Sequence, residues 1–266
     1  MERTKINSAI LRKLYVPSIE SHKGQNGRLL IIAGSRKYHG AFYLCASMAS
    51  KIVDFVYVHT TKDNFEIIKK MRERLAEFIY INKRDLSATI KESDAILMGP
   101  GLTPDANIKK LVNKILKENP HKKILLDAGA LRVADIKFLH KKCVLTPHRQ
   151  EFKALFNIEA SMLAAREIAK KIPSIIILKG STDYIFQNEK CFYNTTGNVG
   201  MTKGGTGDVL AGLLAALLTK TDAITAAQQA IYINGLAGDR LYKTKKQYYS
   251  ASELIPEVQK ILANKR

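Results

Sequence analysis

Short, continuous apolar runs of strand length alternate along this chain with segments whose apolar residues recur every three or four positions. The first such unit comprises a strand at 28–33, a helix at 41–52 and a strand at 55–58. A strand, a helix and a second strand in this order form a βαβ unit, which places the two strands in parallel. The same alternation predicts strands at 77–81, 94–98, 124–126, 143–145 and 174–178, and helices at 64–75 and 105–118.

The two ends of the chain follow other patterns. Ile6, Ile10 and Leu14 have helical spacing, so residues 5–17 are predicted to form a helix. Apolar runs at 184–186 and 190–193 flank the polar turn Gln187-Asn188-Glu189 and predict an antiparallel hairpin. Three helices are expected to close the chain, at 207–219, 222–242 and 251–263. The sequence therefore predicts an α/β fold in one domain over residues 1–266. Its mostly parallel sheet has helices on both faces and an antiparallel edge.

Five of the predicted strands run into polar or glycine-rich loops, at 34–40, 99–104, 127–131, 146–151 and 179–183. In open α/β sheets, ligands bind outside the carboxyl ends of the strands. We therefore expect these loops to converge with a sixth loop, residues 194–208, at one edge of the sheet.

The sixth loop carries the densest glycine cluster, with five of the chain's 16 glycines directly before Asp208 and an apolar helix. Glycines let backbone N–H groups approach a ligand, and a helix start attracts anions, phosphate above all. The Walker pattern is absent because Lys203 precedes the glycine pair, and the loop comes too late in the chain for a dinucleotide fingerprint. A carboxylate beside phosphate repels it, so Asp208 is interpreted as a general base toward a phosphate-accepting hydroxyl. The alternative is an ordinary acidic residue in a first helical turn.

Composition narrows the picture only a little. The formal net charge is +19, but no RNA-binding aromatic signature or cysteine-histidine finger accompanies the lysines, so no nucleic-acid partner is expected. No apolar run is long enough to cross a membrane, and the charged N-terminus lacks the features of a targeting segment. The three cysteines are far apart and lie in apolar contexts, which favours packed thiols and a reducing, cytoplasmic location.

Taken together, the motifs resemble those of the ribokinase-like ADP- or ATP-dependent NAD(P)H-hydrate dehydratases. The resemblance runs from residue 23 to about residue 240 and rests on KGQNG (23–27), AGSRKYHGA (33–41), MGPGL (98–102), LDAGAL (126–131), LTPHRQEF (145–152), LKGSTD (178–183) and GNVGMTKGGTGDVLAG (197–212). It implies a three-layer ribokinase-like sandwich that repairs the S-form of hydrated NADH or NADPH. ADP or ATP would phosphorylate the ring hydroxyl, and loss of phosphate would restore the double bond.

The resemblance also implies roles for individual residues. Asp208 would be the base. The transferring phosphoryl group and the adenine nucleotide would be held by Gly204, Gly205, Thr206 and Gly207 together with Lys179, Gly180, Ser181, Thr182 and Asp183. The hydrated dinucleotide would contact Ala41, Gly101 and His148, and Glu151 would help to organise Mg²⁺ and its waters. For Lys179, His148 and Glu151 the alternatives are a solvated lysine, a structural histidine and an ordinary glutamate at a helix start.

Three positions depart from the family pattern. Lys203 stands where a small residue is usual and is expected to add positive charge beside the phosphates. Asn234 stands where a histidine is common, and Gly129 replaces an acid, so the 127–131 loop is given no chemical role. No epimerase domain is recognisable, so the chain is expected to perform the dehydration alone, as a homo-oligomer, by resemblance a tetramer. Two other functions stay open: a ribokinase-like kinase of a small alcohol, and a non-catalytic nucleotide or nucleic-acid binder.

Overall fold

The computed structural model describes residues 3–71, 73 and 75–264. Its strands are β1 (Arg3–Lys5), β2 (Arg28–Ile32), β3 (Phe55–His59), β4 (Ile79–Tyr80), β5 (Ala95–Met98), β6 (Lys123–Leu126), β7 (Cys143–Leu145), β8 (Ile175–Leu178), β9 (Asp183–Gln187) and β10 (Lys190–Asn194). Its α-helices are α1 (Gly40–Ala49), α2 (Phe65–Met71), α3 (Leu86–Glu92), α4 (Ala106–Glu118), α5 (Ala128–Leu131), α6 (Arg149–Phe156), α7 (Met162–Lys171), α8 (Thr206–Lys220), α9 (Ala223–Lys245) and α10 (Ala251–Ala263). The 3₁₀ helices are η1 (Ser8–Lys13), η2 (Lys62–Asn64), η3 (Ile136–Phe138) and η4 (Val199–Thr202).

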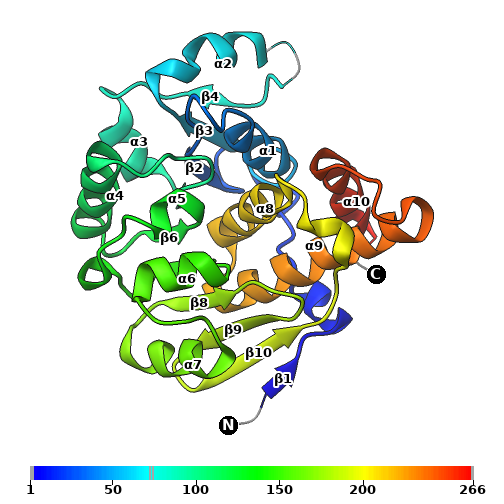
Figure 1. Ribbon diagram of the computed structural model, residues 1–266. Coiled ribbons are helices and arrows are strands. Elements are labelled where there is room, and N and C mark those ends of the chain that lie inside the picture. The colour runs from blue at the N-terminus through cyan, green and yellow to red at the C-terminus, as the bar shows by residue number, and fades with distance from the viewer. Residues whose placement is uncertain (1–2, 72, 74, 265–266) are drawn as a thin grey trace.

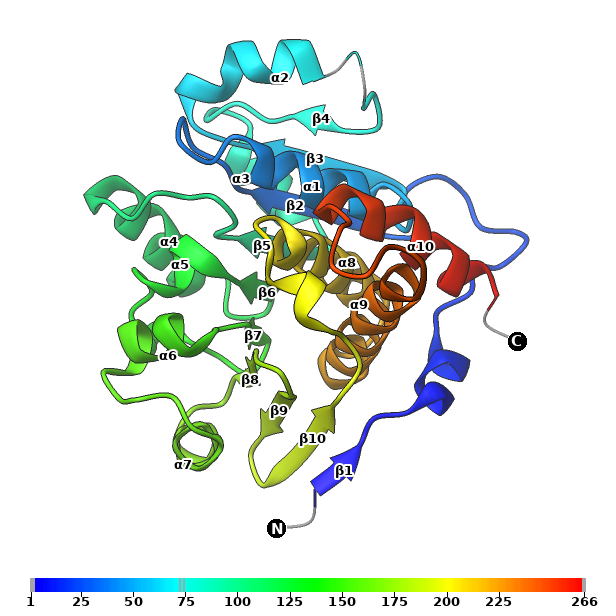
Figure 2. The same cartoon turned by 45° about the vertical axis from the view of Figure 1, so that its right-hand side comes forward.

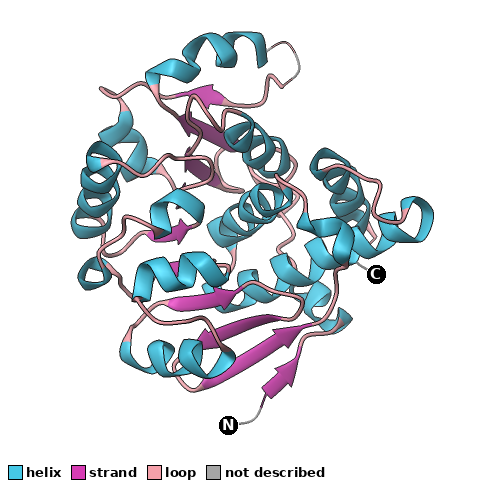
Figure 3. Cartoon of the chain, viewed as in Figure 1, coloured by secondary structure: helices cyan, strands magenta, loops and turns pink. Residues whose placement is uncertain are grey.

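Over these described residues, the strands form one sheet in the order β1-β10-β9-β8-β7-β6-β5-β2-β3-β4 (Figures 1 and 3). All pairs from β8 through β7, β6, β5, β2 and β3 to β4 are parallel. The β8–β9 and β9–β10 pairs are antiparallel. The predicted parallel sheet with an antiparallel edge is thus confirmed.

The sheet is buried on both faces because its central strands are almost wholly apolar: β5, β7 and β8 contain no polar residue, and β2 and β6 have only a charged first residue. On β2, Leu29 and Ile31 face the core shared with α1, α8, α9 and α10, whereas Leu30 and Ile32 face the core shared with α4, α6 and α7. Figure 2 shows the two sets of helices on opposite sides of the sheet. Such continuous apolar strands are typical of parallel sheets with helices on both faces.

The predicted helix at 5–17 is wrong. Residues 3–5 form the edge strand β1, which pairs in parallel with β10, and Ser8–Lys13 is a 3₁₀ helix capped by the Asn7 side chain. Ile6, Ile10 and Leu14 are nevertheless all buried, at 5%, 7% and 8% exposure. The spacing of these three residues therefore predicts their burial correctly. It does not identify the element, because a strand followed by a short 3₁₀ helix buries them as well as an α-helix would.

Other differences are smaller. The strand predicted at 77–81 is only Ile79–Tyr80, and the helix predicted at 64–75 is Phe65–Met71, with residues 72 and 74 outside the described part. The three closing helices are confirmed within three residues at each end. The three cysteines are free and buried, as predicted. No helix in the described ranges is long and apolar enough to cross a membrane.

Candidate active site

Two pockets lie on either side of the first turn of α8. The larger, which we call the α1-side pocket, is a cavity of about 580 Å³ lined by the loops at 34–40, 99–104 and 127–131, by Glu151, and by Gly204, Gly205 and Asp208. The other, the β8-side pocket, is a cavity of about 400 Å³ lined by the 179–183 loop, the 196–202 segment, Thr206, Gly207 and part of α9. The strand-end loops therefore meet at one edge of the sheet, and the turn at residues 204–208 separates two compartments.

The turn itself begins with Gly205, the N-cap of α8, whose φ of +95° favours glycine. Gly204 and Gly207 have no such strain, and a Cβ at either would meet nothing within 4 Å. The first i→i−4 bond of the helix runs from Val209 N–H to Gly205 C=O. The N–H groups of Gly207 and Asp208 precede that bond, so they are available to an anion, as the first N–H groups of a helix generally are.

Asp208 lies at the boundary of the two pockets, on this first turn. Burial, and then the negative charge of Asp127, raise the pKa of Asp208 to about 7, although the nearby ammonium of Lys179 opposes the shift. Its backbone carbonyl accepts a hydrogen bond from Cys45 Sγ at 3.2 Å, which ties the turn to α1. A carboxyl group with a pKa near neutrality can both accept and return a proton at physiological pH.

A buried charged cluster lies beside Asp208. Lys179 Nζ is 2.7 Å from Asp127 Oδ1 and 3.8 Å from Glu151 Oε2, and Thr146 donates its hydroxyl to the same Asp127 oxygen at 2.7 Å. Burial alone would lower the pKa of Lys179, but Asp127 and Glu151 raise it above its ordinary value. Lys179 is therefore a fixed cation, with only 19% of its side chain exposed, and the alternative of a solvated lysine does not hold.

Asp127 is the residue that sequence reasoning missed, because the 127–131 loop had been given no chemical role. The structure corrects this, since Asp127 anchors Lys179 and shifts the pKa of Asp208. The signal was present as a lone carboxylate at the carboxyl end of a buried strand. Gly129, where the family pattern has an acidic residue, is a glycine for a packing reason, because a Cβ there would lie 2.1 Å from Leu102 C=O.

Glu151 and His148 form a capping box at the start of α6. His148 Nδ1 accepts from the backbone N–H groups of Gln150 and Glu151, while Glu151 Oε2 accepts from the backbone N–H of His148. His148 Nε2 lies 3.2 Å from Glu151 Oε1. The backbone carbonyl of Pro147 accepts from Lys179 N–H at 2.9 Å, so the same turn also holds the end of β8. The local sequence thus aims Glu151 at Lys179 and leaves it 6% exposed.

Ala41 and Gly101, both expected to contact the hydrated dinucleotide, line the α1-side pocket together. Their small size has a second cause in the packing of the two loops. A Cβ on Gly101, whose φ is +67°, would lie 2.6 Å from Tyr38 C=O and 2.7 Å from Ala41 Cβ.

Comparison with known proteins decides the family. A family model described as NAD(P)H-hydrate dehydratase matches residues 29–260. The chain belongs to the NAD(P)H-hydrate dehydratase family.

Similar proteins agree with this assignment. The chain is 36% identical to the bifunctional NAD(P)H-hydrate repair enzyme of Methanocaldococcus jannaschii, over 95% of this chain and 51% of that protein. It is 31% identical to the ADP-dependent (S)-NAD(P)H-hydrate dehydratase of Nitrosopumilus maritimus, over 98% of both. The chain spans about half the length of the bifunctional relatives it matches.

Solved structures show the fold. A ribokinase-like superfamily protein from Enterococcus faecalis superposes with a TM-score of 0.90 at 25% identity, covering 99% of this chain and 96% of that one. The ADP/ATP-dependent NAD(P)H-hydrate dehydratase of Bacillus subtilis, co-crystallised with ATP and Mg²⁺, superposes with a TM-score of 0.81 at 25% identity, covering 97% and 98%. The predicted ribokinase-like sandwich is therefore confirmed.

In this family member, the residues expected to hold the nucleotide are divided between the two pockets. Lys179, Gly180, Ser181, Asp183, Thr206 and Gly207 line the β8-side pocket, whereas Gly204 and Gly205 line the α1-side pocket and Thr182 lines neither. Asp183 accepts from Gly180 N–H and Asn194 Nδ2, so it shapes the loop. The hydroxyl of Thr206 lies within hydrogen-bonding distance of the Met201 and Lys203 carbonyls and braces the turn.

Two other expectations change. His148 does not line the α1-side pocket, and its ring caps α6, which supports the structural alternative. Lys203 does not add charge beside the pockets. Its ammonium donates to the backbone carbonyls of Gln247 and Tyr249 and lies 5.6 Å from the centre of the Tyr249 ring.

Asn234 lines the β8-side pocket and is buried, with no hydrogen-bond partner for its Oδ1.

Proposed function

We propose that this chain catalyses the ADP- or ATP-dependent dehydration of the S-form of hydrated NADH or NADPH. The names of its relatives support this activity, in particular that of the Nitrosopumilus enzyme, which matches over nearly its whole length. The observation that carries the proposal is the position of Asp208. It is a carboxyl group with a pKa of about 7 on the turn between two pockets, beside the first N–H groups of a helix.

The two pockets offer a separate place for each of the two substrates. The hydrated dinucleotide places its reacting ring in the α1-side pocket, and the adenine nucleotide lies in the β8-side pocket, which holds the Lys179 loop. The terminal phosphoryl group of the nucleotide then reaches the turn at residues 204–208 from one side, while the ring hydroxyl reaches Asp208 from the other.

The chemistry follows from this arrangement. Asp208 takes the proton of the ring hydroxyl as its oxygen attacks the terminal phosphorus, and the bond to the leaving AMP or ADP breaks. The N–H groups of Gly207 and Asp208 donate to the phosphoryl oxygens, where charge stabilisation dominates such a transfer. Phosphate then leaves the ring carbon, the neighbouring carbon loses a proton, and the double bond of NADH or NADPH is restored.

Mg²⁺ suits the nucleotide, and the residues present fit an indirect role in holding it. Both Glu151 oxygens already accept hydrogen bonds or face Lys179 and His148, so Glu151 can bind waters of the metal more readily than the metal itself. No group of three or more metal-ligating side chains was found among the described residues. The metal would therefore be held mainly by phosphate oxygens and waters, as is usual for Mg²⁺ with nucleotides, and would neutralise phosphate charge.

The test is to incubate the protein with hydrated NADH, Mg²⁺ and either ADP or ATP, and to follow absorbance in the reduced-nicotinamide band. The expected result is recovery of absorbance with release of free phosphate, and the two nucleotide arms settle the donor. Asp208→Asn should abolish recovery, whereas Glu118→Gln on the exposed face of α4 should leave it unchanged. No recovery with either nucleotide would contradict the proposal, and a stable phosphorylated product would point to a small-alcohol kinase.

A further inference from the structure

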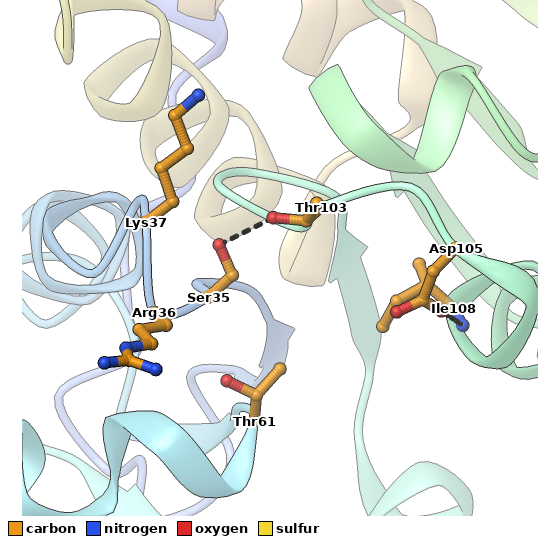
Figure 4. A pocket seen from close by; sticks show the side chains of 7 residues that line it. All are labelled: Ser35, Arg36, Lys37, Thr61, Thr103, Asp105 and Ile108. Carbon is orange, nitrogen blue, oxygen red and sulfur yellow. Dashed lines mark hydrogen bonds between the residues drawn. The ribbon is translucent and has the colours of Figure 1, made fainter.

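A third cavity, which we call the outer pocket, adjoins the α1-side pocket. It has a volume of about 510 Å³ and is lined by Ser35, Arg36, Lys37, Thr61, Thr103, Asp105 and Ile108 (Figure 4). Lys37 and Thr103 line both cavities. The two cavities are therefore neighbours at this edge of the sheet, with Lys37 at their junction and Asp208 on the α1 side.

The outer pocket is cationic on one side. Arg36 and Lys37 are exposed, and neither forms an ion pair with a carboxylate of the described residues. Figure 4 shows the two side chains pointing in opposite directions, with Thr61 on the Arg36 side. Asp105 lies across the pocket, where its Oδ1 accepts from Ile108 N–H at 2.8 Å as the cap of α4. An anion would therefore bind on the Arg36 side.

Hydroxyl groups also line the outer pocket. Thr103 donates to Ser35 Oγ at 3.0 Å, and the same oxygen accepts from Tyr38 N–H. Thr61 Oγ1 is a buried atom with no hydrogen-bond partner. Buried polar atoms are nearly always paired, so an orphaned hydroxyl at the wall of a cavity calls for a ligand or water.

We propose that the outer pocket binds the far nucleoside end of the hydrated dinucleotide, and that Arg36 reads the 2′-phosphate that distinguishes hydrated NADPH from hydrated NADH. This inference rests on the proposed function. With the reacting ring beside Asp208, the rest of the dinucleotide extends past Lys37 into the outer pocket. Lys37 contacts the pyrophosphate common to both substrates, and Arg36 contacts the additional phosphate. A guanidinium group suits this task because it can donate two parallel bonds to phosphate.

The experiment compares kcat/KM for the two hydrated dinucleotides in Arg36→Ala, Lys37→Ala and the unmutated protein. A hydrogen bond to a charged group contributes enough for Arg36→Ala to lower kcat/KM for hydrated NADPH about tenfold or more. The same change should leave hydrated NADH nearly unaffected, whereas Lys37→Ala should lower both substrates alike. Lys141→Ala removes an equal charge from the loop before β7, at the opposite edge of the sheet, and should change neither.

The outcomes separate the two proposals. If the unmutated protein turns over neither substrate, the proposed function fails. If it turns over both and Arg36→Ala affects them equally or not at all, the function stands and the assignment of Arg36 is overturned.

Calorimetry of the products gives a readout independent of turnover. The unmutated protein should bind NADPH more tightly than NADH, by a ratio that falls with added salt and disappears in Arg36→Ala. Inorganic phosphate should compete with NADPH more than with NADH. If phosphate binds through Arg36 without weakening NADPH, the outer pocket is a separate anion site and the proposal is wrong.

Discussion

The first turn of α8 and the rest of the same helix differ in how tightly their residues are packed. In the body of the helix, Val209 to Thr219 are all buried, and Gly212 packs against α1 so closely that a Cβ would lie 2.5 Å from Cys45 C=O. In the first turn, Gly207 faces open space and Asp208 carries a pKa raised to about 7. The body is shaped by close packing within the protein, whereas the turn leaves Gly207 without a packing contact and holds a carboxyl group whose raised pKa is a cost to the fold.

This contrast distinguishes two reasons for a glycine. Gly212 is a glycine because another backbone occupies the place of its side chain. Gly207 has ample room and no positive φ, so the fold alone does not require glycine there. A ligand that approaches the backbone is the remaining physical reason, and it is the one that the proposed phosphoryl transfer provides.

The largest effect is expected from Asp208→Asn, which removes the base from the turn. General-base catalysis typically contributes about 10²–10⁴-fold, so kcat should fall by that factor. Steady-state kinetics on hydrated NADH measures it. A fall below about tenfold would show that Asp208 is not the base.

The same variant should be more stable, because the raised pKa of Asp208 is a cost to the fold. The unfolded chain releases this proton near pH 4 and the folded protein near pH 7, so stability declines as the pH rises between these values. The amide that replaces the carboxyl group in the variant cannot ionise. Urea unfolding should therefore show a gain of about 1–2 kcal/mol at pH 8, discounted for partial exposure, and none at pH 4. An equal gain at both pH values would mean that ionisation is not the cause.

The second test pairs Gly207→Ala with Gly212→Ala. Gly207→Ala should fold normally and lose about 10²-fold in kcat/KM, because a methyl group would displace the phosphoryl group by an ångström or more. Gly212→Ala should lose about 1–3 kcal/mol of stability through overpacking against α1. Urea unfolding and kinetics on both variants measure the two effects. If Gly207→Ala kept full activity, the turn would not approach a ligand.

The third test concerns the charges beside the turn. Asp127→Asn should lower the pKa of Asp208, so the acid limb of kcat/KM should move to lower pH. Lys179→Met should move it to higher pH, because Lys179 opposes the upward shift. Both variants break the buried Lys179–Asp127 pair and should lose stability. Since that loss is common to both, shifts of the pH profile in the same direction would contradict the electrostatic account.

The smallest effect on activity is expected from Lys203→Ala, although Lys203 directly precedes the glycine pair. Its ammonium bonds backbone carbonyls of residues 247 and 249 and does not face the pockets. Removal should cost about 1 kcal/mol of stability and leave the KM values for both nucleotides nearly unchanged. If the KM for ADP or ATP rose several-fold, Lys203 would contribute to phosphate binding after all, and the account would be wrong on this point.

The sequence predicts well those features of the fold and the site that are formed by residues close together in the chain. Each loop of the site comes directly after a buried strand, so the rule that ligands bind at carboxyl ends of strands brings the loops together without further information. The turn at residues 204–208 is similarly local, because its glycines, Asp208 and the apolar helix are consecutive.

Pairings between distant residues could not be predicted in this way. Lys179 and Asp127 are 52 positions apart, and nothing in either loop alone reveals the other. The ammonium of Lys203 points away from the site because it donates to backbone carbonyls that lie more than 40 positions later in the chain. His148 carries no local sign of whether its ring faces a ligand or caps its own helix, and only the folded turn shows the second.

The most direct test of the central claim, that Asp208 is a base tuned by its place between two pockets, is the pH dependence of kcat/KM for hydrated NADH with saturating nucleotide and Mg²⁺. The account predicts a fall of tenfold per pH unit on the acid side of an apparent pKa near 7. That limb should be absent from the residual activity of Asp208→Asn. A profile that stays flat from pH 8 down to about pH 5 would contradict it, because an aspartate with an ordinary pKa near 4 remains ionised over that range.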